Sequence, residues 1–180
     1  GDARSADTQS IMNQKIKFRE SFRPFAPSVL AERSKAYFDL KTDSPYMLLV
    51  APVNEERRLN SDTELPDDDN MLPIINRKRS DIPAVTHVDY SARIQTVSCD
   101  EKPDYYALIK EFENLTGYGL IVNTSFNVRG EPIVASPEDA YRCFMRTGID
   151  MLVLENCILQ KTEQPVFADD EDWRETYAVD

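Results

Sequence analysis

The sequence predicts one α/β or α+β domain with a mixed β-sheet. The chain has 180 residues, 41% of them hydrophobic, which suits a single domain with its own core. A continuous apolar run at 47–53 is typical of a strand covered on both faces. A helix pattern with a well-defined start follows Ser136. Strand-type and helix-type patterns intermix along the chain, and this mixture indicates the α/β or α+β class.

The first half of the chain is predicted to hold a linker, two strands and a loop. Residues 1–14 show no apolar period, and we expect them to be a linker from a missing amino-terminal domain. Apolar, basic and proline residues over 16–30 predict an extended strand. The run 47–53 is expected to be a central strand. Residues 54–80 are acidic and too poor in apolar side chains to pack, so we expect a long mobile loop.

The next segments predict a strand followed by a helix. Alternation over 84–98 is typical of a strand or hairpin with one polar face. Residues 103–116 predict a helix that ends at Gly117. The expected apolar stripe of this helix contains Leu108, Phe112 and Leu115, and Tyr105 and Ile109 are expected beside it.

The last segments predict one helix, three strands and a tail. A strand is expected at 118–124. The helix after Ser136 has Pro137 in its first turn and acidic residues at its amino end, and Gly148 follows its last turn. Its expected apolar stripe contains Ala140, Phe144 and Met145. Residues 151–154 and 157–161 are expected to be two further strands, and residues 162–180 an acidic tail.

The net charge of −11 comes from two short segments. Residues 54–70 carry a net −5 and residues 162–180 a net −6, so the remainder holds 18 basic and 18 acidic residues. A local basic pocket for phosphates is therefore compatible with the overall acidity.

The residue types present argue against several classes of protein. No run of 18 apolar residues and no signal-like start are visible, so we expect a cytoplasmic chain without membrane contact. The three cysteines have no C-x-x-C spacing, and the chain has one histidine. We therefore expect neither a disulfide framework nor a transition-metal site within this chain.

Two stretches have the composition of anion sites. Lys15, Lys17, Arg19 and Arg23 would point to one face of an extended strand and suit phosphate or carboxylate. The alternative is a solvated strand edge, which charge alone favours. The second stretch is 123–130, where an apolar strand runs into hydroxyl, amide, arginine and glycine residues, as at many ligand sites. An ordinary turn explains that composition equally well.

A resemblance to a known family decides between these alternatives. The blocks Lys17–Ser28, His87–Val97 and Asn123–Ile133 closely resemble the carboxy-terminal domain of O-carbamoyltransferases that modify nodulation factors, cephalosporins and aminoglycosides. The resemblance covers about 15–161. It implies a YrdC-like fold, an open twisted mixed sheet flanked by helices.

The resemblance also implies a reaction and its site. Lys17 and Arg19 match the lysine-any-arginine pair of YrdC-like proteins, and Ser125 and Asn127 match their serine-any-asparagine pair. These pairs hold a nucleotide and an acyl-phosphate precursor. The implied activity is formation of carbamoyl adenylate from ATP, expected with Mg²⁺, and carbamoyl phosphate. The missing amino-terminal domain would then transfer the carbamoyl group to a hydroxyl acceptor.

Other charged residues are weaker candidates. Arg23 could neutralise phosphate. Arg93 could bind an anion or pair with Asp89, and Arg129 could bind phosphate or bridge to Glu131. His87 is given a supporting role at most.

Two other functions stay open from the sequence. The chain could be a non-catalytic nucleotide- or RNA-binding module, although no basic stretch interleaved with aromatic residues favours nucleic acid. It could also be a structural partner of the transferase domain, although retention of both residue pairs argues against pure scaffolding.

Overall fold

The computed structural model describes residues 1–59, 75 and 77–167. The chain divides into two compact units where we had expected one. The first unit comprises Gly1–Ser10 and Phe22–Thr124, and the second comprises Ile11–Ser21 and the chain from Ser125 onward.

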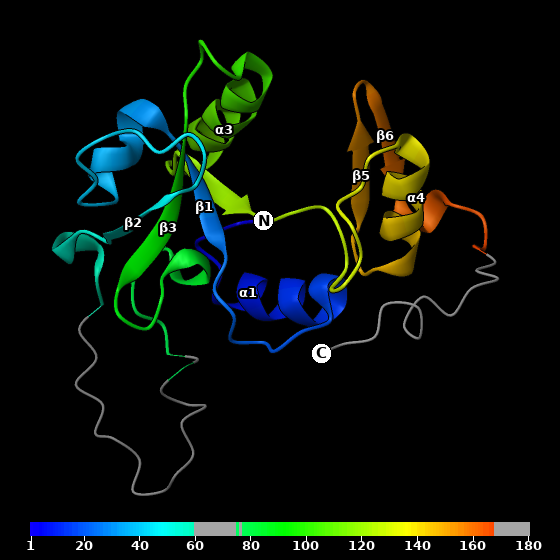
Figure 1. Cartoon of the computed structure of the whole chain (residues 1–180), viewed down its shortest axis with the longest axis horizontal. Helices are drawn as coiled ribbons and strands as arrows, with labels where there is room; N and C mark the ends of the chain where they lie inside the picture. The colour runs from blue at the N-terminus through cyan, green and yellow to red at the C-terminus, as the bar shows by residue number, and fades with distance from the viewer. Residues whose placement is uncertain (60–74, 76, 168–180) are drawn as a thin grey trace, which may run out of the picture. The chain divides into compact units, whose positions relative to one another are not determined.

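The first unit is built on a four-stranded sheet in the order β2-β3-β1-β4 (Figure 1). The strands are β1 (Ala26–Leu30), β2 (Leu49–Pro52), β3 (Ser91–Val97) and β4 (Leu120–Asn123). The pair β1–β3 is parallel, and the pairs β1–β4 and β2–β3 are antiparallel. The predicted α/β class with a mixed sheet is confirmed.

Helix α3 (Pro103–Thr116) packs against one face of this sheet, where Ile109 contacts Leu30 and Val97. The helix ends at Gly117, whose φ of 79° lies in the left-handed region that glycine adopts without strain, as the sequence predicted. The predicted apolar stripe was wrong. Leu115 is 77% exposed and Leu108 is also exposed, because the helix turns its Ile109 side toward the sheet.

Strand β2 lies at the edge of the sheet, which corrects the central position predicted for residues 47–53. Only Ala51 is buried within it, and Leu48 just before it is 79% exposed. A strand is buried on both faces only where other elements cover both faces of the sheet, and an apolar run does not establish that cover. In the described sheet β2 pairs only with β3.

The amino-terminal residues have more regular structure than the sequence predicted. Helix α1 (Ala6–Met12) occupies half of the expected linker and is followed by a π-helix over Asn13–Lys17. Gly1 and Val122 exchange hydrogen bonds through the terminal ammonium and backbone groups. The strand predicted from residue 16 begins only at Ala26.

The second unit contains helix α4 (Pro137–Arg146) and a hairpin of β5 (Met151–Leu154) and β6 (Cys157–Gln160). All three elements were predicted. Ser136 caps α4, because its Oγ accepts from the Asp139 backbone N–H at 3.1 Å while the Asp139 carboxylate accepts from the Ser136 N–H at 3.2 Å.

The core of the second unit forms between α4 and the hairpin, where Ala140 and Phe144 pack with Leu152. Four 3₁₀ segments complete the described structure of both units: Ala31–Ala36, Glu55–Arg57, Pro83–Val85 and Lys161–Glu163. Most of the predicted 54–80 loop and of the 162–180 tail lies outside the described residues. None of the helices in the described residues has the length and apolar character needed to cross a membrane.

Candidate functional site

Lys17 is the centre of the candidate site in the second unit. It is 4% exposed, and its ammonium donates to four oxygen atoms on a segment more than 100 residues away. The acceptors are the carbonyl oxygen and Oγ of Ser125, at 2.5 and 3.0 Å, and the carbonyl oxygen and Oδ1 of Asn127, at 2.9 and 2.8 Å. A lysine is rarely this buried unless its ammonium has hydrogen-bond partners. Here the partners are uncharged carbonyl, hydroxyl and amide oxygens.

The backbone around Lys17 explains how the side chain reaches these acceptors. The π-helix ends at Lys17, and Phe18 follows with a φ of 49°. Asn13, which is fully buried, stabilises this reversal. Its carbonyl accepts from the Arg19 backbone N–H at 3.0 Å, and its side-chain amide donates to the Ser21 carbonyl at 3.0 Å.

The acceptor loop is held by its own hydrogen bonds. Ser125 Oγ donates to Asn127 Oδ1 at 2.6 Å, and Asn127 Nδ2 donates to the Glu131 carbonyl at 2.7 Å. The Glu131 carboxylate accepts from the Val128 backbone N–H at 3.0 Å. Gly130 has a φ of 81°, which lets the chain turn between these two contacts. These hydrogen bonds hold the acceptor oxygens in place.

Burial, together with the charge of Arg19, lowers the pKa of Lys17 to about 8, while Cys143 and Glu131 oppose the change. The ammonium is therefore still mostly charged at pH 7. Burial raises the pKa of Cys143 to about 11, so this cysteine is a neutral thiol under the same conditions. All four Lys17 acceptors are uncharged, so none of them neutralises its positive charge.

This arrangement permits exchange of Lys17 partners. An ammonium has three N–H groups, and four oxygens share them here, so at least one contact is bifurcated. Ser125 is exposed to solvent. A phosphoryl oxygen that arrives on that side can replace a weak contact without leaving the ammonium unpaired.

The other predicted cations in the second unit are held by neighbours. Arg19 Nε donates to Asn13 Oδ1 at 2.6 Å. Arg129 Nη1 lies 3.8 Å from Glu20 Oε1, an ion pair that sequence reasoning did not identify. The common strand face predicted for residues 15–23 was wrong, because Lys15 is exposed on the helical segment that buries Lys17.

The remaining predicted residues belong to the first unit. Arg23 is exposed ahead of β1, and Arg93 is exposed on β3 opposite Val50. Within the described chain, Asp89 forms no ion pair with Arg93. Its carboxylate accepts from the Ser91 N–H at 3.0 Å and the Ser91 hydroxyl at 2.7 Å.

His87 has a structural position in the turn before β3. Its backbone N–H donates to the Ser91 carbonyl at 2.8 Å, and its Nδ1 lies 3.1 Å from Ser91 Oγ. Burial lowers the pKa of His87, which favours the neutral ring.

Asn13 and Glu131 are the site residues that sequence reasoning missed. Asn13 lay in the expected linker, and no local pattern marks an amide as buried. Glu131 had a weak signal, because it follows the polar stretch 123–130 directly.

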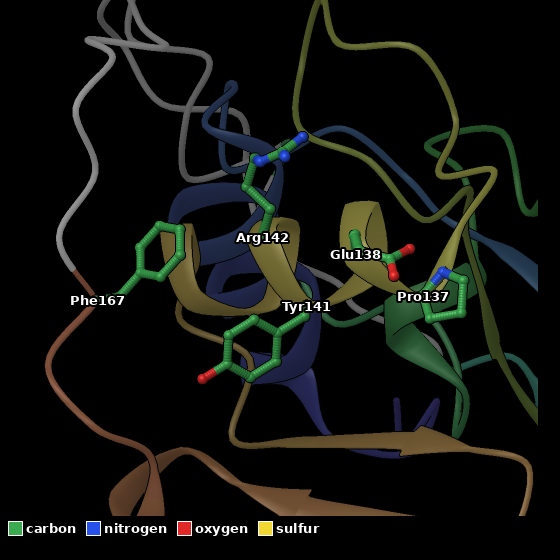
Figure 2. Close-up of a pocket in the computed structure, with 5 residues that line it drawn as sticks. All are labelled: Pro137, Glu138, Tyr141, Arg142 and Phe167. Carbon is green, nitrogen blue, oxygen red and sulfur yellow. The ribbon is translucent and has the colours of Figure 1, made fainter.

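A separate pocket in the second unit contains none of the predicted site residues. Its volume is about 400 Å³, and Figure 2 shows the residues that line it: Pro137, Glu138, Tyr141, Arg142 and Phe167. Among the described residues, no group of three His, Cys, Asp or Glu side chains could hold a metal ion.

Comparison with known proteins gives the family. Residues 1–161 match the family model described as Carbamoyltransferase C-terminus. An uncharacterized protein of Synechocystis is 58% identical over 182 residues, which cover 100% of this chain and 29% of that protein. Nodulation protein NolNO of Sinorhizobium fredii is 38% identical over 175 residues, which cover 96% of this chain and 22% of NolNO.

An archaeal protein extends this set. An uncharacterized protein of Methanocaldococcus jannaschii is 31% identical over 160 residues, which cover 89% of this chain and 23% of that protein. This chain thus spans less than a third of the length of each of these relatives. The family-model match confirms the resemblance inferred from three blocks of sequence. The chain belongs to the carbamoyltransferase C-terminus family.

Proposed function

We propose that this chain binds ATP and carbamoyl phosphate and forms carbamoyl adenylate, and that another part of the same polypeptide transfers the carbamoyl group to a hydroxyl acceptor. The observation that carries this proposal is the contact of Lys17 with Ser125 and Asn127. Residues from two distant segments thereby combine a positive charge with fixed hydrogen-bonding groups, which a polyanionic substrate requires. The greater length of the relatives supports the second part of the proposal.

The proposed reaction has two chemical stages. Water releases phosphate from carbamoyl phosphate and leaves carbamate. A carbamate oxygen then attacks the α-phosphorus of ATP, so one P–O bond forms and the bond to pyrophosphate breaks. Both stages bring anions together, so positioning and charge neutralisation provide most of the catalysis.

The residues have different proposed roles. Lys17 and Arg19 neutralise phosphoryl oxygens, and Ser125 and Asn127 orient them. Arg23, Arg93 and Arg129 are proposed as additional nucleotide- or substrate-binding cations. Mg²⁺ would be bound mainly through the nucleotide phosphates, as is usual for this ion.

One observation favours a second candidate, a non-catalytic module in which Lys17 only fastens the 125–131 loop. Lys17 makes all four of these hydrogen bonds to oxygen atoms of the chain itself. In that case the replacement of Lys17 would lower stability and leave ligand binding unchanged. The two candidates therefore differ in a measurable way.

The test is carbamoyl-phosphate-dependent exchange of labelled pyrophosphate into ATP by the purified chain, with ATP binding measured by calorimetry. The Lys17→Met variant is compared with Lys15→Met, which removes an exposed ammonium two residues away. We expect Lys17→Met to weaken ATP or carbamoyl phosphate binding by about 1.5–3 kcal/mol, the scale of a charge-assisted hydrogen bond. Equal binding and exchange in both variants, with a lower melting temperature for Lys17→Met, would favour the non-catalytic module.

A further inference from the structure

The first unit contains a second concentration of cations, which lies around a cavity of about 460 Å³. Arg77, Lys78 and Arg79 line it, and none of Lys17, Arg19, Ser125 and Asn127 does. A cavity of this size holds a small molecule.

The three cations differ in how their charge is used. Arg79 is 7% exposed, and its Nη1 donates to the carbonyl oxygens of Ile75 and Arg77, both at 2.9 Å. These bonds hold the backbone that carries Arg77 and Lys78. Lys78 is exposed. Arg79 therefore stabilises the backbone of the cavity wall, while Arg77 and Lys78 provide positive charge for a ligand.

Arg77 provides the second observation. Its Nε and Nη2 atoms are buried and have no hydrogen-bond partner among the residues that the structure describes. Buried N–H groups are nearly always paired, because an unpaired polar group loses its water without compensation, and the loss is largest for charged groups. An oxyanion at the cavity wall would supply the partner that these guanidinium atoms lack.

The rest of the cavity wall restricts the ligand further. Phe22, Ile75 and Val88 contribute apolar surface, so an inorganic anion alone would leave that surface without a partner. Asp89 also lines the cavity, but Ser91 donates two hydrogen bonds to its carboxylate. The lining therefore contains three cations, Arg77, Lys78 and Arg79, and one carboxylate that is already hydrogen-bonded, so the pocket has a net positive charge.

We propose that this pocket binds a phosphorylated small molecule whose remaining part is apolar or aromatic. The phosphoryl oxygens pair with Arg77 and Lys78, and the apolar part packs on Phe22 and Val88. Arginine and phosphate match in geometry as well as in charge, which favours phosphate over a neutral polar group. The proposal is independent of carbamoyl adenylate formation, because the two sites share no residue.

His87 is a convenient reporter, because it lines this pocket and is the single histidine of the chain. Chain labelled with ¹³C,¹⁵N-histidine is titrated with phenyl phosphate, and the imidazole resonances are followed by NMR. Inorganic phosphate, phenol and benzoate are titrated in parallel. We expect saturable shifts with phenyl phosphate and much weaker binding of the other three. Equal affinity for phenyl phosphate and phenol, or for phenyl phosphate and inorganic phosphate, would overturn the proposal.

Variants connect the signal to the residues named. We expect Arg77→Met to weaken phenyl phosphate binding at least about tenfold, the factor that corresponds to about 1.4 kcal/mol. Lys78→Ala is expected to weaken it less, and Lys41→Ala, an exposed lysine outside the pocket, is the matched control. The melting temperature of Arg77→Met is expected to stay unchanged or rise, because the variant removes unpaired buried groups. Unchanged affinity in both Arg77→Met and Lys78→Ala would refute the proposed contacts.

Discussion

Titration of Lys17 gives a direct measure of how its burial affects folding. Its pKa falls from the ordinary 10.5 to about 8 in the folded chain. The unfolded chain therefore binds more protons than the folded chain between these two pH values, and the free energy of unfolding rises with pH across this window. At about 1.4 kcal/mol per pKa unit, the full contribution is about 3 kcal/mol, and most of it appears between pH 7 and pH 10.

The assay is urea unfolding at pH 7 and pH 10 for the chain and for Lys17→Met, each also carrying Cys143→Ala. The second substitution is needed because the Cys143 thiol, with its pKa raised to about 11, titrates near the same range and interacts with Lys17. We expect the stability difference between the lysine and methionine chains to shift by about 2–3 kcal/mol in favour of lysine at pH 10. No shift, or a shift of opposite sign, would refute the conclusion that Lys17 is buried as a destabilised cation.

Two further predictions concern the second unit. Ser136→Ala removes the acceptor for the Asp139 N–H at the start of α4 and is expected to cost about 1 kcal/mol in urea unfolding, with Ser136→Gly as a milder comparison. Unchanged stability of the alanine variant would contradict the capping contact. Gly148→Ala would bring a new Cβ to 2.8 Å from Lys15 Cβ and 3.2 Å from the Lys15 carbonyl oxygen, and is expected to cost about 1–3 kcal/mol. A neutral effect would mean that the 11–21 segment does not pack tightly there.

The helices show what the sequence could predict. Helix α4 begins and ends where its Ser136 cap and following Gly148 indicated, and α3 ends at Gly117 as expected. These features depend on hydrogen bonds and backbone conformations within a few residues, so local sequence contains them. Which face of α3 packs on the sheet depends on its contacts with β1 and β3. The sequence therefore placed Ile109 beside the apolar stripe, whereas in the structure Ile109 is the buried residue of the helix.

The position of β2 shows the same limit on a larger scale. Its apolar run indicated a strand correctly, but the number of neighbouring strands is a property of the whole sheet. For residues 13–17, alternating charges suggested a strand, while the contacts of Asn13 with Arg19 and Ser21 stabilise a helical turn. Sequence pattern alone does not contain these contacts.

The energetics of Lys17 bear on the choice between a fastening role and a binding role. A methionine could fill similar space beside the 125–131 loop without the desolvation cost that lowers the lysine pKa to about 8. Water could pair with acceptors on the exposed Ser125. A buried ammonium that costs about 3 kcal/mol is thus an unfavourable way to hold a loop, by the pKa arithmetic used above. The free-energy cost of burying the Lys17 ammonium is explained if its positive charge binds an anionic ligand. Strongly perturbed pKa values cluster at functional sites. The lowered pKa of Lys17 therefore favours the proposed catalytic role over the structural one.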